Sequence, residues 1–128
     1  MRKTPAALVA ACALSLFTAV RAAEGPPERS EEQMYRSFAV SRCLALATPE
    51  SDVGRDAVRS AAGYLELGRL PIEAYEAASA LAEAQLKVPY NAQDGGSLDV
   101  MRCVDLYDSD AMGKLVREHV PRRWRRRR

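Results

Sequence analysis

The sequence predicts an all-α protein, a compact bundle of about five helices that one disulfide holds together. Three observations predict this class. Apolar residues recur at spacings of three and four in five separate segments, which is the period of a helix that packs on one side. We find no apolar–polar alternation longer than four residues that would indicate a strand. Short stretches of Pro, Gly, Ser and Asp separate the segments, so consecutive helices are expected to run mostly antiparallel.

Residues 1–22 have the layout of a secretory signal peptide. Arg2 and Lys3 form a basic start, and residues 6–20 carry no charge and are rich in Ala, Leu and Val. A cleavage site is expected directly after Ala22. The mature protein is therefore expected in the periplasm.

The uncharged run of about 15 residues is shorter than the ~20 that a membrane-spanning helix needs, so no membrane span is expected. The alternatives are an uncleaved N-terminal anchor and lipidation of Cys12, which follows a Val-Ala-Ala box but comes early in the apolar run. Residues 23–29, AEGPPER, predict a flexible linker. A helical domain is expected over residues 30–120.

The charge is divided unevenly along the chain. Removal of residues 1–22 takes away three of the 19 basic residues and no acidic one, so 16 basic and 17 acidic residues remain, a net charge of −1. Seven arginines lie in residues 117–128, whereas residues 23–115 carry a net charge of −7.

Residues 121–128 predict a disordered Arg-rich tail. Nucleic acid is not an expected partner, because an exported chain rarely meets it and the tail holds a single aromatic, Trp124. Contact with anionic lipid or an acidic partner is the alternative.

Two N-terminal helices are expected from their caps. Ser30, with a Gln three residues later, makes a capping box for a helix over residues 31–47. Ser51 or Asp52 caps the second helix, and Gly68 is its expected C-terminal stop.

The third helix is expected to begin at Pro71, since proline suits the first helical position, and to end at Pro89. One of its faces is acidic and carries Glu73, Glu76 and Glu83. Residues 88–97, VPYNAQDGGS, have turn-forming composition throughout and predict the longest internal polar loop.

Two short helices are expected after this loop. Ser97 caps the fourth helix, and Ser109 precedes a fifth helix that ends at Pro121. The inward side chains of the fourth helix are expected to be Leu98, Met101, Val104 and either Leu106 or Tyr107.

Two cysteines remain after cleavage, Cys43 and Cys103. Sixty positions separate them, and in an oxidising compartment two thiols on facing helices are expected to pair. Closing a loop of that size contributes roughly 4 kcal/mol in the chain-entropy model. The alternative is a pair of buried free thiols on separate core faces.

Chemical motifs are scarce, and no catalytic residue, metal or cofactor is assigned. The single histidine, His119, has basic neighbours and no carboxylate placed to orient it, and paired cysteines offer no thiolate. Asp105, Asp108 and Asp110 lack the spacing of a calcium loop. A small exported helical domain with a protruding loop suits a protein that binds and blocks another protein.

Residues 98–109, LDVMRCVDLYDS, resemble a hallmark of the type VI secretion amidase immunity proteins, family 4: a Cys-hydrophobe-Asp-Leu-Tyr-x-Ser run before the last helix. Residues 41–47, SRCLALA, are similar to the cysteine segment of that family's first helix. The resemblance covers about residues 31–119 and leaves out the Arg-rich tail. It implies a periplasmic, all-α immunity protein that forms a homodimer.

The resemblance also implies the partner, a cognate secreted amidase of the papain-like cysteine hydrolase type that cuts peptidoglycan peptides. Self and sibling cells would be protected by a loop that enters the cleft of this effector, and no enzyme activity of the inhibitor is needed. The alternatives are a periplasmic inhibitor or adaptor of another envelope hydrolase, and a small envelope enzyme that uses Asp105 and Asp108.

The expected effector-binding residues lie on the loop and on the third helix. Tyr90 is the candidate aromatic anchor, with a ring tucked against the third helix as the alternative. The candidate hydrogen-bonding side chains are Asn91, Gln93 and Asp94. The acidic residues Glu73 and Glu76, together with Glu83, are expected to attract a basic effector surface, the alternative being a solvated face. Asp105 is expected to satisfy a backbone donor or an arginine.

Overall fold

The computed structural model describes residues 25–125. These residues form five α-helices and one short 3-10 turn: α1 (Glu31–Ala47), α2 (Asp52–Leu67), α3 (Ile72–Gln85), α4 (Asp99–Asp105), α5 (Asp110–His119) and η1 (Arg122–Trp124). The predicted all-α class and the order of the helices are confirmed. The expected signal peptide, residues 1–22 with Cys12, and residues 126–128 of the expected tail lie outside the described residues.

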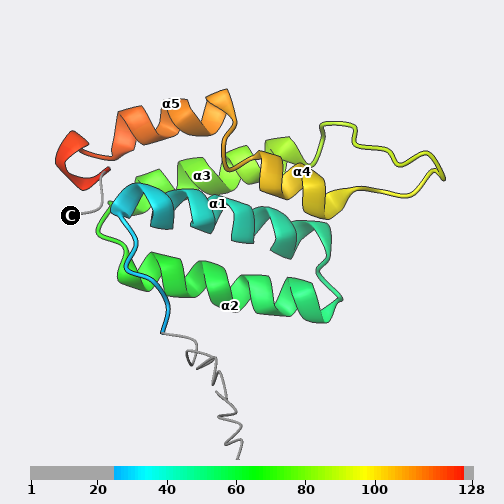
Figure 1. Cartoon of the computed structure of the whole chain (residues 1–128), viewed down its shortest axis with the longest axis horizontal. Helices are drawn as coiled ribbons and strands as arrows, with labels where there is room; N and C mark the ends of the chain where they lie inside the picture. The colour runs from blue at the N-terminus through cyan, green and yellow to red at the C-terminus, as the bar shows by residue number, and fades with distance from the viewer. Residues whose placement is uncertain (1–24, 126–128) are drawn as a thin grey trace, which may run out of the picture.

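Helix α1 is the centre of the bundle. It packs against each of the other four α-helices, most extensively against α2 and then α3. Figure 1 shows α2 on one side of α1 and α3 on the other, with α5 packed on α3. The segment between α3 and α4 extends away from the bundle, at the end opposite to η1. Within the described residues no helix is long and apolar enough to cross a membrane.

Serine caps set the starts of the first two helices. The Ser30 hydroxyl accepts a hydrogen bond from the Gln33 amide at 3.2 Å, and the Gln33 side chain accepts one from the Ser30 amide at 2.9 Å, which makes a reciprocal capping box. In α2 the cap is Ser51 and not Asp52, since the Ser51 hydroxyl accepts from the Gly54 amide at 2.9 Å. Local chemistry therefore decides both boundaries.

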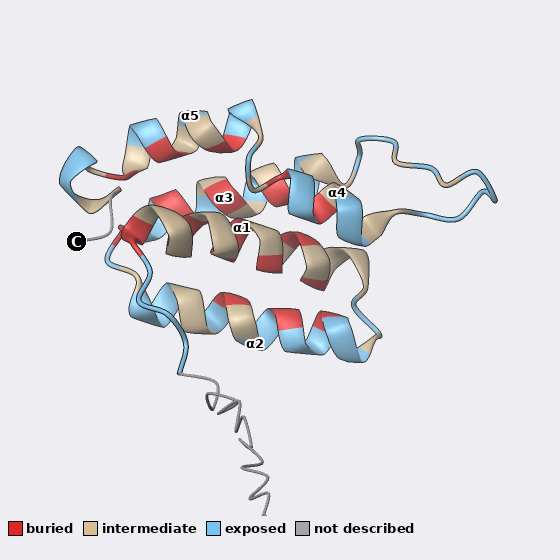
Figure 2. Cartoon of the chain, viewed as in Figure 1, coloured by how far each residue is buried: buried red, intermediate tan, exposed pale blue. Residues whose placement is uncertain are grey.

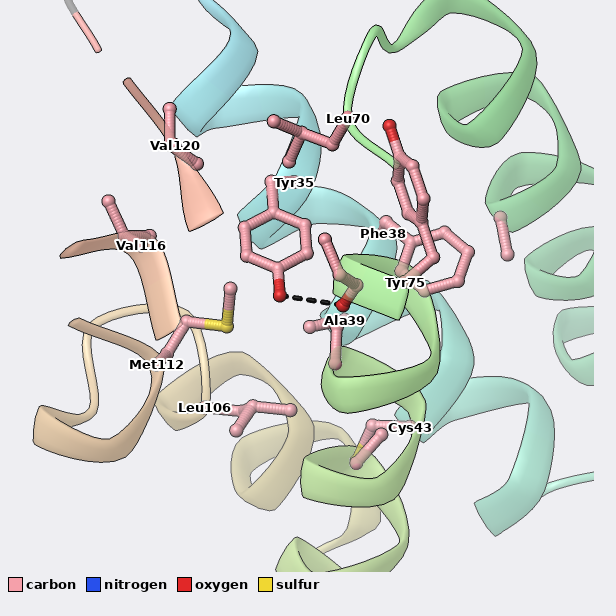
Figure 3. Packing of buried hydrophobic residues seen from close by; sticks show 14 of the residues in the cluster. Tyr35, Phe38, Ala39, Cys43, Leu70, Tyr75, Leu106, Met112, Val116 and Val120 are labelled. Carbon is pink, nitrogen blue, oxygen red and sulfur yellow. Dashed lines mark hydrogen bonds between the residues drawn. The ribbon is translucent and has the colours of Figure 1, made fainter. Parts of the chain in front are cut away.

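The core is built around aromatic rings from α1 and α3 (Figure 3). Tyr35 is fully buried, and its hydroxyl donates to the backbone carbonyl of Ala74 at 2.7 Å. Its ring meets that of Tyr75 edge-on with centroids 5.9 Å apart, and Phe38 packs on Tyr75 at 4.9 Å. Removal from water raises the pKa of the Tyr35 hydroxyl.

Small residues cover the rest of the interface between the helices. Figure 2 shows that α2 buries only the side that faces α1, and the buried residues there are Gly54, Ala57 and Ala61. Alanines also fill the contact between α1 and α3, where Ala39, Ala74 and Ala78 are fully buried. The abundance of alanine thus lets the helices approach closely around the aromatic rings.

The predicted disulfide is present. Cys43 of α1 and Cys103 of α4 are bonded, with their Cα atoms 5.5 Å apart, and both residues are fully buried. Cys103 is the one buried residue of the seven-residue α4. Because a helix of two turns is not stable alone, the disulfide is the main link that holds α4 against the core.

The outward side of α4 corrects one prediction. Met101 and Val104, which were expected to face inward, are 53% and 54% exposed. The disulfide turns Cys103 toward α1, so residues one and two positions away on this short helix face solvent. Of the two candidates near the end of the helix, Leu106 is fully buried and Tyr107 is only partly covered.

Gly68 is the C-cap residue of α2, but it is a glycine for another reason than the expected one. Its φ of −76° lies outside the left-handed region, so its backbone conformation does not require glycine. A Cβ atom at this position would overlap the hydroxyl of Tyr75. The close approach of the Tyr75 side chain is therefore the physical reason for a glycine here.

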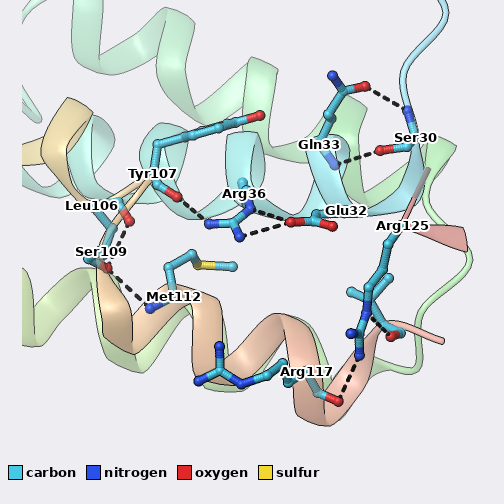
Figure 4. Close-up of polar contacts among 11 residues, drawn as sticks. Ser30, Glu32, Gln33, Arg36, Leu106, Tyr107, Ser109, Met112, Arg117 and Arg125 are labelled. Carbon is cyan, nitrogen blue, oxygen red and sulfur yellow. Dashed lines mark hydrogen bonds and ion pairs between the residues drawn. The ribbon is translucent and has the colours of Figure 1, made fainter. Parts of the chain in front are cut away.

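Part of the stretch expected to be disordered is ordered. Residues 121–125 continue from α5 into η1, and the Arg125 guanidinium donates to the carbonyls of Val120 at 2.8 Å and Arg117 at 3.0 Å (Figure 4). Carbonyls at the end of a helix lack partners within the helix, and the helix dipole favours a cation there. Capping of α5 therefore orders the start of the expected tail.

The disulfide makes a testable contribution to stability. We predict that Cys43→Ser and Cys103→Ser each lower the free energy of unfolding by about 4 kcal/mol, because the unfolded chain regains the entropy of an open loop. The double variant should be no less stable than either single one, since both remove the same bond. Thermal denaturation followed by circular dichroism measures this. Additive losses, or a double variant as stable as the parent, would contradict the assignment.

Candidate functional site

Residues 90–98 form a narrow hairpin that projects from the bundle between α3 and α4 (Figure 1). Amide-to-carbonyl hydrogen bonds cross it from Leu98 to Tyr90 at 3.3 Å and from Ala92 to Gly96 at 2.9 Å. An isolated antiparallel β-bridge lies between these two pairs. The segment expected to be a polar loop is therefore a hairpin with a defined shape.

The turn of the hairpin depends on one glycine. Gly95 has a φ of +83°, in the left-handed region that favours glycine. Its amide donates to the carbonyl of Ala92 at 3.0 Å, and the Asp94 carboxylate accepts from the Gly96 amide at 2.9 Å. This is the pattern of a three-residue hairpin turn with glycine at its left-handed position. The tip is thus preorganised by its own backbone.

Tyr90 lies at the base of the hairpin and rests on α4. Its hydroxyl donates to Asp105 Oδ2 at 3.0 Å, and the Arg102 guanidinium lies 5.9 Å from the centre of its ring. The hydrogen bond to Asp105 raises the pKa of the Tyr90 hydroxyl. The ring is half-buried, so Tyr90 braces the hairpin, and the partner of Asp105 is this tyrosine and not the expected backbone donor or arginine.

Arg102 joins both ends of the hairpin, a role that sequence reasoning missed. Its guanidinium donates to the carbonyl of Leu86 at 2.6 Å and lies 3.3 Å from the Asp99 carboxylate. In return, the Gln85 side chain donates to the backbone carbonyl of Arg102 at 2.9 Å. The end of α3 is thereby tied to α4. The one hint of this role in the sequence is that Arg102 is the only basic residue in the recognised run, residues 98–109.

The structure brings only some of the predicted binding residues together. Asn91, Gln93 and Asp94 are exposed near the tip of the hairpin. Glu73 and Glu76 are also exposed, but they lie in the first turns of α3, whereas the hairpin follows its last turn. At 1.5 Å per residue, the two groups are separated by roughly 18 Å along the helix. Glu73 and Glu76 therefore lie on a surface distinct from the hairpin, whereas Glu83 is in the last turn of α3.

A second surface feature is an apolar groove of about 490 Å³ between α2 and α3. Its exposed apolar side chains include Val58 and Ile72, which are 53% and 55% exposed. Charged residues of both signs line it as well: Arg42, Glu76 and Glu83. Ile72 begins α3 and lies at this groove rather than in the core.

The recognised CVDLYDS run serves the fold. Leu106 is buried in the core, and Ser109 caps α5 with its side chain. The backbone carbonyl of Tyr107 accepts a hydrogen bond from Arg36 of α1, whose guanidinium also lies 5.7 Å from the centre of the Tyr107 ring (Figure 4). The most recognisable residues therefore position α4 and α5 on α1.

The histidine and the acidic side chains of the described residues form no candidate metal site. The ring of His119 meets the buried Tyr35 ring edge-on, with centroids 6.3 Å apart. Among residues 25–125, no group of three or more His, Cys, Asp or Glu side chains is arranged to hold a metal ion. The described residues therefore offer a partner a surface of fixed shape.

A rigid helical bundle that presents a preorganised polar hairpin defines a small binding protein that acts through contact. The comparison with protein families is more specific: residues 33–116 match the model of the type VI secretion system amidase immunity proteins, Tai4. The chain belongs to this family, which confirms the resemblance carried by residues 98–109. No curated protein matches the chain significantly.

Solved structures similar to this chain come from effector–immunity systems. A chain in the Tae4/Tai4 system of Salmonella typhimurium is 26% identical with a TM-score of 0.66, over 73% of this chain and 93% of that one. A chain in the complex of Salmonella typhimurium Tae4 with Enterobacter cloacae Tai4 is 26% identical with a TM-score of 0.64, over 72% and 98%. A chain in the Enterobacter cloacae Tae4–Tai4 complex is 26% identical with a TM-score of 0.63, over 72% and 97%.

The left-handed glycine gives a local test of the hairpin. Gly95→Ala should speed hydrogen exchange of the Ala92 amide about tenfold, because a side chain in the left-handed region costs roughly 1–2 kcal/mol. Gly96→Ala is the matched control: its Cβ would meet only the exposed Asp94 side chain, which can move, and its φ is not positive. Exchange measured by NMR distinguishes them. Equal acceleration in both variants, or none in Gly95→Ala, would show that the turn does not hold the hairpin.

Proposed function

We propose that this chain is a periplasmic immunity protein that binds a cognate type VI secreted peptidoglycan amidase and inhibits it by filling its active-site cleft. Membership of the Tai4 family and the solved complexes of Tae4 with Tai4 support this partner. The observation that carries the mechanism is the hairpin of residues 90–98, which projects from the bundle with a polar tip. Self and sibling cells are protected because the effector is blocked.

The hairpin has the shape and the chemistry to enter a cleft. It is a narrow ribbon whose conformation is set by the Gly95 turn and by the contacts of Arg102 at its base. Such a preorganised segment loses little conformational entropy when it docks. The exposed side chains at its tip supply donors and acceptors for a polar cleft: Asn91, Gln93 and Asp94. The effector in this proposal is a papain-like cysteine hydrolase, and an occupied cleft denies it the peptidoglycan substrate.

Occlusion requires no reaction on the part of the inhibitor. In this proposal the chain is not an enzyme and uses no cofactor. The contribution of Tyr90 and Asp105 is mechanical, since their hydrogen bond at 3.0 Å holds the hairpin against α4.

The acidic face contributes at longer range. Glu73, Glu76 and Glu83 are exposed on α3 and add to the net charge of −7 of residues 23–115. An acidic surface attracts a basic effector from a distance and raises the association rate more than the affinity. These glutamates therefore act on encounter, and the hairpin acts on inhibition.

The disulfide supports the compartment. Bonds of this kind form and persist in oxidising compartments such as the periplasm, and Cys43 and Cys103 are bonded. We place the mature protein in the periplasm, exported by a signal peptide that is cleaved after Ala22.

A shortened hairpin tests the proposed mechanism. Replacement of residues 92–96 by an Asn-Gly turn should weaken inhibition of the cognate amidase at least a hundredfold, because the tip no longer reaches the cleft, while thermal stability stays unchanged. The measurement is a titration of amidase activity on purified peptidoglycan.

The matched control for the shortened hairpin is Lys114→Gln on α5, whose side chain is 72% exposed. This variant should inhibit as the parent does. If the shortened hairpin inhibits equally well, the effector is blocked through another surface. If the parent protein itself leaves the cognate amidase active, the proposed inhibitory function is wrong.

In this proposal the chain forms a homodimer, and the groove between α2 and α3 is its interface. The groove exposes apolar side chains that a second copy would cover, and Arg42 shares it with Glu76 and Glu83. A two-fold axis brings the same patch of both copies together, so Arg42 of one copy can pair with Glu76 or Glu83 of the other, while Glu73, which does not line the groove, still faces an effector. Apolar burial and charge complementarity thus favour a second copy as the occupant.

Sedimentation velocity tests this dimer. Val58→Asp combined with Ile72→Asp should convert the dimer to a monomer, because two charges would be buried without partners. Val53→Asp is the control, since Val53 is equally exposed on α2 at 55% but does not line the groove. Dissociation by the control alone, or a parent that is monomeric, would rule out this interface.

A further inference from the structure

Three large apolar side chains of α4 face solvent. Val100, Met101 and Val104 are 60%, 53% and 54% exposed, whereas Cys103 of the same helix is fully buried. Positions three and four apart in a helix are neighbours on its surface, so these three side chains lie on one side of α4. The disulfide from Cys43 to Cys103 holds the opposite side on α1. We call these three residues the apolar face of α4.

The apolar face lies at the base of the hairpin. An open groove of about 670 Å³ is lined by its three side chains, by Ser97 and Leu98 at the end of the hairpin, and by Thr48 after α1. Figure 2 shows exposed parts of α4 directly beside the projecting segment. Among the described residues, none lines both this groove and the one between α2 and α3. A second copy and another partner can therefore cover the two grooves at the same time.

The hairpin alone is small for a stable interface. It consists of residues 90–98, whereas stable specific interfaces take about 20–30 residues from each partner. A hairpin that fills a cleft also brings the surface around its base against the rim. Asp94 at the tip is four positions from Leu98, so at about 3.3 Å per residue the tip extends roughly 13 Å beyond α4. A cleft of that depth places its rim on the apolar face.

The apolar face supplies contacts that the polar tip of the hairpin lacks. Interfaces combine a desolvated apolar centre with polar contacts around it, and the exposed side chains of the tip, such as Asn91 and Asp94, are polar. Helix α4 is also held in place, because the Arg102 side chain is only 12% exposed and its guanidinium donates to the carbonyl of Leu86 at 2.6 Å. The apolar face is therefore preorganised, and little conformational entropy is lost when a partner covers it.

We propose that the apolar face of α4 is a second contact surface for the secreted amidase and packs against the rim of the cleft that the hairpin enters. This inference rests on the proposed function, since it takes the same partner and extends the same site. The hairpin blocks the cleft, and the apolar face keeps the complex together. Contacts of this kind act mainly on the dissociation rate, whereas the acidic side chains of α3 act on association.

Binding kinetics test the proposal with the exported chain, its disulfide intact. Replacement of Val100, Met101 and Val104 together by Gln removes the apolar contact without adding charge, and Gln favours a helix. Because about half of each side chain is already covered, each contributes roughly fivefold to affinity, and the triple variant should raise the Kd about a hundredfold. Most of this change should be a faster dissociation rate. Surface plasmon resonance with the cognate amidase measures both rates.

Two controls match this variant. Replacement of the same three residues by Leu should change the Kd less than about threefold, because the face stays apolar and Leu also favours a helix. Leu67→Gln controls for position: Leu67 is 70% exposed on α2 and lines neither groove, so this variant should bind the amidase as the parent does.

Two further readouts separate a contact surface from a structural role. In the Gln variant the Ala92 amide should exchange at the parent rate, since the hairpin keeps its own turn, and sedimentation velocity should show an unchanged mass. Faster exchange at Ala92 would show that α4 only holds the hairpin, and loss of a dimer would show that a second copy covers the face. Either result, or an unchanged Kd, would overturn the inference.

The failure of this inference is distinguishable from the failure of the proposed function. If the shortened hairpin no longer inhibits while the Gln variant binds as the parent does, the inference alone is wrong. If the parent does not bind the amidase, the proposed function is wrong and the inference falls with it.

Discussion

The bond between Cys43 and Cys103 is the constraint on which the position of the hairpin depends. Helix α4 has two turns, buries only Cys103, and turns its other apolar side chains toward solvent. Leu106, directly after α4, is buried in the core, and the remaining ties of α4 are polar: Arg102 reaches the carbonyl of Leu86, and Asp105 accepts from Tyr90. Polar contacts near water contribute little each, so the covalent link supplies the fixed base that a protruding segment needs. The proposed binding surface therefore depends on a bond that forms and persists in compartments that oxidise thiols.

The hairpin combines exposure with order, two properties that seldom occur together in a polar segment of this composition. Cross-strand hydrogen bonds, the left-handed Gly95 and the Asp94 carboxylate set its shape before any partner arrives. At the other end of α3, the buried Tyr35 hydroxyl donates to the carbonyl of Ala74 and joins α1 to α3. The energy of an encounter is then spent on contacts with the partner and not on ordering the loop.

The sequence predicts best what local chemistry decides. Ser30 and Ser51 fix the starts of two helices through hydrogen bonds within one turn, and the turn-rich composition of residues 88–97 indicates the projecting segment. Tertiary effects decide the rest. The inward orientation expected of Met101 fails because a disulfide overrides the periodicity of a short helix.

Features that join distant residues were also beyond the sequence. The pairing of Tyr90 with Asp105 and the bracing by Arg102 link positions 15 or more residues apart. The most direct measurement of the central claim is hydrogen–deuterium exchange of the complex with the cognate amidase. The account predicts slowed exchange across residues 91–97, while unchanged exchange there in a fully inhibited complex would contradict it.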